Sequence, residues 1–266
     1  MRKHKPSWPL TPLNFLRLWI LLVAPLLPSA AYAVGGPPHC ALATVAGNYA
    51  VTTLGQQAGE YAAAVFLMTS DGNGDLSGSG AESLNGTVFS NVTVVGTYTA
   101  NSNCWFTATM TDSLGNISNF SGAIGQNGYE LVGPSTDDGT QMQFIAYRLY
   151  ATQCTLQSLA EKFGAQVQSP LTPSGSSTAT QQWYLRKTGS GTGSWAANVN
   201  GTIVQGTATT TFSVNSDCTY TSTVTNSDGT TGHFFGIGGI RVNDVGWVSM
   251  ATDSGWVSLA TGYFTR

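Results

Sequence analysis

Four cysteines are the residues of this chain whose spacing points most clearly to a chemical role. Cys40 and Cys104 are 64 positions apart, and Cys154 and Cys218 have the same separation. Four cysteines allow three pairings, but the equal spacings favour Cys40–Cys104 and Cys154–Cys218, one disulfide in each half of the chain. Four free thiols or a zinc site are weaker interpretations, because the chain has no Cys-x-x-Cys motif and no nearby pair of histidines.

A short acidic segment has the oxygen spacing of a calcium-binding loop. Side-chain oxygens occupy positions 1, 3, 5, 7 and 12 of this segment, at Asp71, Asn73, Asp75, Ser77 and Glu82. Position 6, which is glycine in such loops, is Leu76, and the flanking sequence has the pattern of strands rather than of helices. A hairpin turn at residues 71–74 is therefore the favoured interpretation, and calcium binding is the weaker alternative.

Side chains suited to catalysis are scarce after residue 33. That part of the sequence has two histidines, His39 and His233, and its pair of adjacent acids, Asp137-Asp138, lies in a turn. Neither Gly-x-Ser-x-Gly nor His-Glu-x-x-His occurs. We therefore expect a non-enzymatic protein with no catalytic residue, metal or cofactor, and a hydrogen-bonded or solvated imidazole at His233.

Residues 1–33 have the organisation of a secretory signal peptide. Four basic residues between positions 2 and 17 precede an apolar run at residues 18–27, and Ala31-Tyr32-Ala33 matches a small-x-small cleavage site. The apolar run is too short for a membrane-spanning helix, which needs about 20 residues. We expect an exported chain, secreted or periplasmic, in an oxidising compartment where disulfides persist.

The charge of the remaining chain excludes two classes of partner. Four of the ten Lys and Arg residues lie within residues 1–33, so residues 34–266 hold six against 13 Asp and Glu residues, a net charge of −7. Nucleic-acid binding needs a basic patch, and docking on anionic lipid needs clustered Lys or Arg. We expect neither a nucleic acid nor an anionic membrane surface as partner.

The chain is an internal duplication. Asn101-Ser102-Asn103-Cys104 recurs 114 positions later as Asn215-Ser216-Asp217-Cys218, and Phe120 and Gly122 recur as Phe234 and Gly236 at the same offset. Repeated self-similarity at one period indicates copies of one structural unit. The duplication predicts two domains, residues 34–150 and 151–266.

Within each copy, alternating apolar and polar residues between turn signals indicate β-strands. In the first copy the expected strands are residues 47–54, 61–69, 75–84, 87–100, 105–111, 117–124, 129–133 and 141–150. Eight strands joined by short turns fit a closed meander barrel, which leaves no exposed sheet edge. We predict an all-β protein of two tandem eight-stranded antiparallel barrels, with a two-sheet sandwich as the alternative.

One expected strand of the first copy is apolar on both faces. Tyr61, Ala63, Val65 and Leu67 alternate with Ala62, Ala64, Phe66 and Met68 along residues 61–69. Because successive side chains point to opposite faces of a strand, one set can line the barrel while the other needs cover. The neighbouring copy is the expected source of that cover.

The pattern Gly-x-Tyr-Thr-x-Asn-x-x-Cys at residues 96–104 resembles a group of secreted bacterial β-barrel repeat proteins. This resemblance covers both copies and implies export and an all-β barrel. More loosely, Gly47-Asn48-Tyr49 on the first strand and Arg148 on the last resemble the calycin architecture of lipocalins and avidins. The lipocalin-like resemblance implies a small apolar ligand inside a barrel.

These observations together favour a non-enzymatic tandem-barrel module. Its expected role is to bind a small apolar ligand or to serve a structural or surface-interaction function, with an unspecified partner protein. The expected ligand lining lies in the first copy, at Tyr49, Tyr98, Phe106, Met110 and Arg148. The alternative is an outer-membrane barrel in which both copies supply about 16 strands to one pore, and a secreted enzyme is a third possibility.

Overall fold

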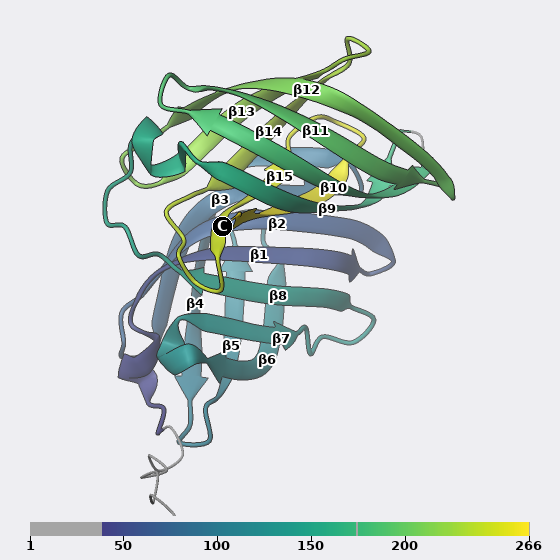
Figure 1. Ribbon diagram of the computed structural model, residues 1–266. Coiled ribbons are helices and arrows are strands. Elements are labelled where there is room, and N and C mark those ends of the chain that lie inside the picture. The colour runs from purple at the N-terminus through teal and green to yellow at the C-terminus, as the bar shows by residue number, and fades with distance from the viewer. Residues whose placement is uncertain (1–38, 174, 266) are drawn as a thin grey trace, which may run out of the picture. The chain divides into compact units, whose positions relative to one another are not determined.

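A computed structural model of the chain describes residues 39–173 and 175–265 (Figure 1). The signal peptide expected at residues 1–33 lies outside this described part. Across the described residues the protein is built from antiparallel β-strands with three short 3-10 helices. In this part of the chain, no helix combines the length and the apolar character that crossing a bilayer requires.

The first eight strands close into a barrel, here called barrel 1. Each strand pairs with the next along the chain, and the last strand pairs with the first, so that Thr52 lies opposite Ile145. Two 3-10 helices, η1 (Leu42–Val45) and η2 (Gln126–Gly128), accompany these strands. The strands are β1 (Gly47–Gln57), β2 (Glu60–Ser70), β3 (Asp75–Leu84), β4 (Thr87–Ala100), β5 (Trp105–Asp112), β6 (Ile117–Gly125), β7 (Glu130–Pro134) and β8 (Gln141–Arg148).

The second eight strands repeat this arrangement as barrel 2, which the 3-10 helix η3 (Leu156–Leu159) precedes. Its strands are β9 (Lys162–Thr172), β10 (Gly175–Arg186), β11 (Ser190–Val199), β12 (Thr202–Val214), β13 (Thr219–Asn226), β14 (Thr231–Ile237), β15 (Val245–Ala251) and β16 (Val257–Phe264). Pairing of β16 with β9 closes the barrel. The prediction of two eight-stranded meander barrels is confirmed, whereas the sandwich and the single sixteen-stranded pore are wrong.

The residues in the turns explain how consecutive strands of each barrel are connected. Asn85-Gly86 and Asn200-Gly201 form matching two-residue turns in the two copies, and all four residues have positive φ, between 49° and 87°. Two successive residues in that region make the turn that follows the right-handed twist of a hairpin, and Asn-Gly is the sequence that adopts it most easily. The turns therefore fix the register of β3 with β4 and of β11 with β12.

The repeated Asn-Ser-x-Cys segment is a turn that places a disulfide. In barrel 1 the side chain of Asn101 accepts hydrogen bonds from the backbone N–H groups of Asn103 and Trp105, at 3.0 and 3.1 Å. The turn carries Cys104, which is bonded to Cys40 beside η1. Barrel 2 has the equivalent disulfide, Cys154–Cys218. Both predicted pairings are confirmed, and each bridge ties the start of its copy to the turn after its fourth strand.

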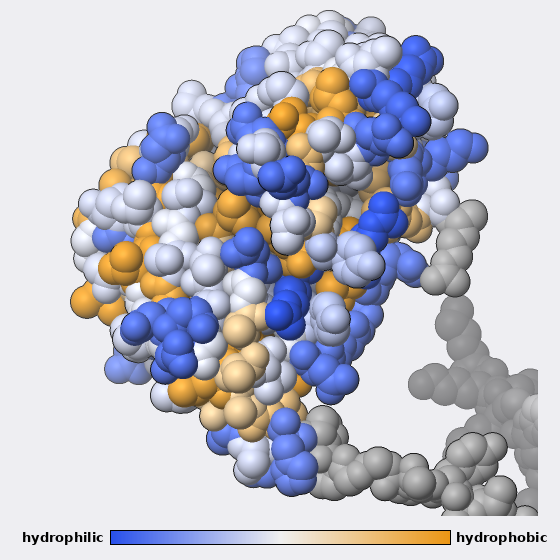
Figure 2. Space-filling view, turned by 90° about the vertical axis from the view of Figure 1, so that its left-hand side faces the viewer, coloured by the Kyte–Doolittle hydropathy of each residue, from blue (hydrophilic) through white to orange (hydrophobic). Residues whose placement is uncertain are grey.

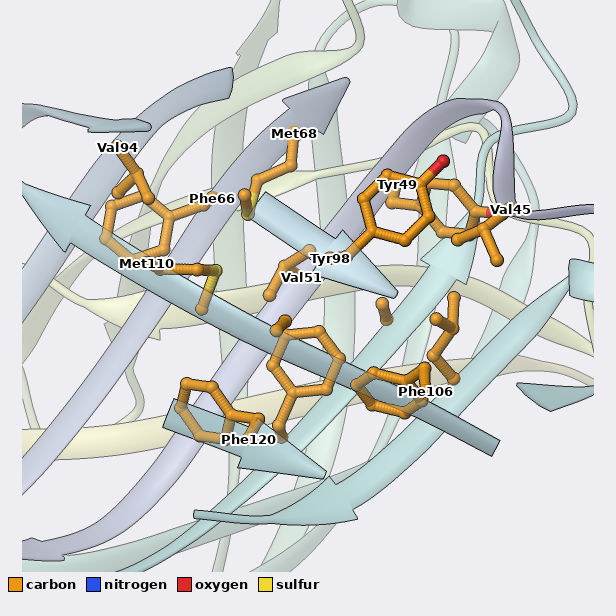
Figure 3. Close-up of a cluster of buried hydrophobic side chains, with 14 of the residues drawn as sticks. Val45, Tyr49, Val51, Phe66, Met68, Val94, Tyr98, Phe106, Met110 and Phe120 are labelled. Atoms are coloured by element: carbon orange, nitrogen blue, oxygen red, sulfur yellow. The ribbon is translucent and has the colours of Figure 1, made fainter. Parts of the chain in front are cut away.

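The interior of barrel 1 is a packed apolar core (Figure 3). Phe144 contacts two other rings, with centroids 5.7 Å from Phe106 and 5.0 Å from Phe120. Val45 of η1 and Met68 of β2 belong to the same cluster, so the 3-10 helix contributes to the core. Large side chains from every part of the first copy therefore meet inside its barrel.

A second apolar cluster, here called the shared core, joins the two barrels. Its buried members come from barrel 1, from the strands of barrel 2 and from the segments next to those strands. They are Ala50, Val65, Ala81, Tyr147, Cys154, Cys218, Ile237, Ile240, Val242, Val245, Val248 and Met250. Strand β2 contacts β14, β15 and β16, and Val65 is completely buried. The expected cover of the outer face of β2 by the other copy is thus confirmed.

Polar contacts accompany the shared core. Ser83 Oγ on β3 donates a hydrogen bond to the carbonyl oxygen of Trp256 at 2.7 Å. Nearby, the N–H of Gly255 donates to the carbonyl oxygen of Gly86 at 2.8 Å. Elsewhere on the surface, the face shown in Figure 2 carries small apolar areas separated by polar residues. The shared core is therefore the place where the copies bury apolar surface against each other.

Candidate functional site

The expected ligand lining of barrel 1 lies inside the barrel but leaves little space. Four of the five expected residues are buried there and belong to one hydrophobic cluster inside the barrel (Figure 3), namely Tyr49, Tyr98, Phe106 and Met110. The cavity that remains among them measures about 30 Å³. Because one water needs roughly 10–15 Å³, this space holds no more than a few atoms. The side chains fill the barrel that we expected them to line.

The polar ends of the two tyrosines hold the closed end of barrel 1. Tyr49 Oη donates a hydrogen bond to the carbonyl oxygen of Gly128 in η2 at 2.6 Å, and Tyr98 Oη donates to that of Leu42 in η1 at 3.0 Å. Burial raises the pKa of Tyr49 to about 12, so it stays neutral and donates. The tyrosines fasten the two short helices over the strands.

Arg148, on the last strand β8, lies at the same end of barrel 1. Its guanidinium donates a hydrogen bond to the carbonyl oxygen of Ala46 and lies 5.5 Å from the centroid of the Tyr129 ring. A Cβ on Gly47 would come within 2.9 Å of its Nε, so the glycine is what lets the arginine approach. These contacts join the first and last strands of the barrel.

The five candidate calcium ligands do not converge on one point. Asp71 Oδ1 accepts hydrogen bonds from the N–H groups of Asn73, Gly74 and Asp75 at 2.7–3.0 Å. These bonds, chiefly that from Asn73, hold the pKa of Asp71 below its ordinary value. Glu82 is seven residues beyond Asp75 on the same strand, which is about 23 Å away. The segment has the geometry of the hairpin turn that the sequence favoured.

Glu82 instead belongs to a pair of carboxyl groups, itself buried and its partner half-buried, which the strand pattern does not reveal. It points into barrel 1, is 7% exposed, and is hydrogen-bonded to Asp112 at the end of β5. Burial and the neighbouring Asp112 raise the pKa of Glu82 to about 7. Asp112 also accepts hydrogen bonds from the N–H groups of Leu114 and Asn116. Glu82 therefore keeps its proton in mildly acidic solution, where an exposed glutamate has lost it, and releases it around neutral pH.

His233 forms a pair with Asp253 that the sequence analysis missed. The imidazole Nδ1 lies 2.7 Å from Asp253 Oδ1, and the backbone N–H of His233 donates to Oδ2 at 2.6 Å. Barrel 1 has the same arrangement at the equivalent position, where Asn119 donates to both carboxylate oxygens of Asp137 at 2.6 and 2.8 Å. An aspartate in the turn before the last strand thus clamps the sixth strand in both barrels, which supports a structural role for His233.

The repeated clamp predicts that His233→Asn leaves the protein intact. Asparagine makes both bonds in barrel 1, so the free energy of unfolding is expected to stay within about 0.5 kcal/mol of the wild-type value. His233→Ala loses the side-chain bond and should cost about 1 kcal/mol. Urea denaturation of the two variants compares these values. A His233→Asn variant as unstable as His233→Ala would contradict the clamp.

The interior of barrel 2 keeps more space than that of barrel 1. Its cavity measures about 70 Å³, room for a molecule of several heavy atoms at roughly 10–15 Å³ for one water. Five aromatic rings contribute to its lining, with apolar and neutral polar side chains between them. The lining residues are Leu159, Val167, Gln181, Trp183, Leu185, Thr210, Phe212, Tyr220, Ser222, Val224, Phe234, Trp247, Ser249 and Ala260.

The aromatic rings of barrel 2 lie against glycines on neighbouring strands. A Cβ on Gly262 would come within 2.1 Å of the Trp247 ring, so only glycine allows the indole to lie flat on the wall. The rings and the other lining side chains leave about 70 Å³ of free space inside the barrel. The pairs directly opposite each other are Trp183 with Gly193, Tyr220 with Gly236, and Trp247 with Gly262.

The polar groups around this cavity differ in whether they already have partners. Trp183 Nε1 donates to Gln181 Oε1 at 2.7 Å, and Tyr220 is hydrogen-bonded to Ser249. The buried Nε1 of Trp247 has no hydrogen-bond partner in the described part of the chain. Burial raises the pKa of Tyr220, which stays neutral. The cavity is therefore apolar and aromatic, with a small number of uncharged polar groups.

Comparisons with known proteins assign no family to the chain. No protein-family model matches the sequence, and no curated protein matches it. Among solved structures, isotype 1 transferrin binding protein B from serogroup B Neisseria meningitidis is similar, with a TM-score of 0.34 and 6% sequence identity. The match covers 78% of this chain and 63% of the other, so this chain spans less than two thirds of that protein. A similarity of this level assigns no function.

Proposed function

We propose that the protein is an exported, non-enzymatic binding module in which barrel 2 receives a small, largely apolar molecule. The observation that carries this proposal is the aromatic cavity of about 70 Å³ inside barrel 2. Ligand sites in proteins are concave, mostly apolar and lined by aromatic side chains with few polar groups. The cavity of barrel 2 has this composition.

In this proposal the two barrels have different roles. Barrel 1 keeps about 30 Å³ of free space, and its tyrosines and Arg148 are engaged in bonds that close the barrel. We therefore place the ligand in barrel 2 rather than among the residues first expected to line it. Barrel 1 serves as the support against which the strands of barrel 2 pack through the shared core.

Export and the absence of enzymatic chemistry rest on separate observations. The two disulfides support an oxidising compartment, either the periplasm or the extracellular space. The His233–Asp253 pair has a structural counterpart in barrel 1, and the lining of the barrel 2 cavity contains no acid, base or thiol among the described residues. These features support binding rather than catalysis.

The proposal predicts that filling the cavity abolishes binding. Ala260 lines the cavity and is buried, so Ala260→Leu places three more carbons inside the barrel. Overpacking of this kind costs about 1–3 kcal/mol, and the affinity for benzene is expected to fall roughly tenfold or more. NMR titration of benzene against the tryptophan indole N–H resonances measures the affinity.

A matched substitution on the surface controls for the change of residue. Ala123 is exposed on β6 of barrel 1, and Ala123→Leu is expected to bind benzene as the wild type does. Circular dichroism checks that both variants are folded. If benzene shifts no indole resonance of the wild-type protein, or if Ala260→Leu binds it equally well, a structural or surface-contact role becomes the better interpretation.

A further inference from the structure

The side chains that line the barrel 2 cavity restrict the charge and the polarity of the ligand as well as its size. The first restriction concerns charge. None of the described residues that line the cavity is ionised at neutral pH. A charged group inside an apolar environment is strongly unfavourable unless it is paired. The cavity therefore selects against ions and favours an uncharged molecule.

Gln181 supplies the second restriction. Its Oε1 accepts the hydrogen bond from Trp183 Nε1, and an indole nitrogen can only donate. That bond fixes which end of the carboxamide is oxygen, an assignment that depends on the surrounding hydrogen bonds. The Nε2 end of Gln181 is left with two N–H groups, and Gln181 lines the cavity and is half-buried.

A second polar group of the lining is also a hydrogen-bond donor without an acceptor. The indole N–H of Trp247 is buried without a partner in the described residues, and an unmet buried donor is unfavourable. The hydroxyl groups of Tyr220 and Ser249 are engaged with each other. Ring atoms of Trp247 and Trp183 lie directly against their glycines on the wall, and aromatic rings are surfaces on which a flat molecule stacks.

We infer that the ligand of barrel 2 is an uncharged, flat, largely apolar molecule with a hydrogen-bond acceptor, such as a carbonyl oxygen or a ring nitrogen, which Gln181 Nε2 binds. This inference rests on the proposed function and adds to it the polarity of the ligand and the residue that recognises it. Trp183 is the positioning residue, because its indole N–H orients the carboxamide.

Pyridine and benzene test this inference because they have the same shape and differ in one acceptor. At pH 8 pyridine is uncharged, and its ring nitrogen accepts a hydrogen bond. Gln181→Leu removes the donor and keeps a side chain of similar size. We expect it to weaken pyridine binding roughly 3- to 10-fold, the loss of about one hydrogen bond, and to change benzene binding less than about twofold.

The neighbouring residue provides the matched control. Gln182 is exposed on the outer face of the same strand, and Gln182→Leu is expected to leave both affinities unchanged. In the wild-type protein, pyridine should move the side-chain amide proton resonances of Gln181 downfield, and benzene should not. This second readout applies even if Gln181→Leu fails to fold.

The outcomes separate the inference from the proposed function. Benzene binding with no effect of Gln181→Leu on pyridine overturns the inference and leaves the cavity as a ligand site. The same conclusion follows if pyridine leaves the Gln181 amide resonances in place. Failure of both probes to bind the wild-type protein overturns the proposed function together with the inference.

Discussion

Replacing Val65 by aspartate is expected to lower the free energy of unfolding by about 3–5 kcal/mol. Val65 points out of barrel 1 into the shared core and is completely buried. A carboxylate there has no partner, and an uncompensated buried charge costs several kcal/mol. Because the shared core includes residues of both barrels, both are expected to lose stability together. Urea denaturation followed by circular dichroism and by tryptophan fluorescence measures the effect.

Val95 is the matched control for this substitution. It also points out of barrel 1, on β4, but it is 61% exposed. Val95→Asp is therefore expected to change the free energy of unfolding by no more than about 0.5 kcal/mol. Equal denaturation midpoints for Val65→Asp and Val95→Asp would mean that the two barrels do not depend on the shared core.

The second large effect concerns pH and the buried Glu82. Its pKa rises from an ordinary 4.5 to about 7 on folding, because it is buried beside Asp112. The folded protein therefore holds this proton more tightly than the unfolded chain does. The stabilisation of the folded state by this tighter proton binding is fully present below pH 4.5 and is lost as the pH rises through 7. At about 1.4 kcal/mol for each pKa unit, the expected loss between pH 4.5 and pH 8 is on the order of 3 kcal/mol.

Glu82→Gln should remove most of this dependence, since an amide of the same shape does not ionise. Urea denaturation at pH 5 and pH 8 gives the comparison. Glu60→Gln, a change at an exposed residue at the start of β2, serves as the control and should keep the wild-type pH dependence. If wild type and Glu82→Gln lose the same stability between the two pH values, another group is responsible.

Much of the fold could be predicted from the sequence because its determinants are local. The Asn-Gly turns, the alternation of strand residues and the equal cysteine spacings each act within one hairpin or one copy. Expected and observed strands agree closely, for instance at Asp75–Leu84 and Thr87–Ala100. The apolar residues on both faces of β2 also indicated the contact between the copies, because such a strand requires a second layer over its outer face.

The candidate site was less predictable because it depends on residues brought together by register. Apolar side chains in the first copy suggested a ligand, but large inner side chains fill a small barrel. The open space in barrel 2 depends on glycines such as Gly262 lying opposite Trp247 on another strand, which a single strand pattern does not show. Glu82 and Asp112 are 30 positions apart, and their meeting follows from the register of β3 and β5 on the two sides of β4.

The contact between the barrels joins unlike faces of the two copies. Strand β2 of the first copy meets β14, β15 and β16 of the second, so unlike faces are in contact and the interface is heterologous. A heterologous contact can in principle repeat and build an open array. In the second copy the strand equivalent to β2 is β10, whose outward residues Thr178, Thr180 and Gln182 are exposed and polar. A polar face of this kind offers little apolar surface for a further barrel to bury, as does the polar outer face of a terminal repeat in a solenoid.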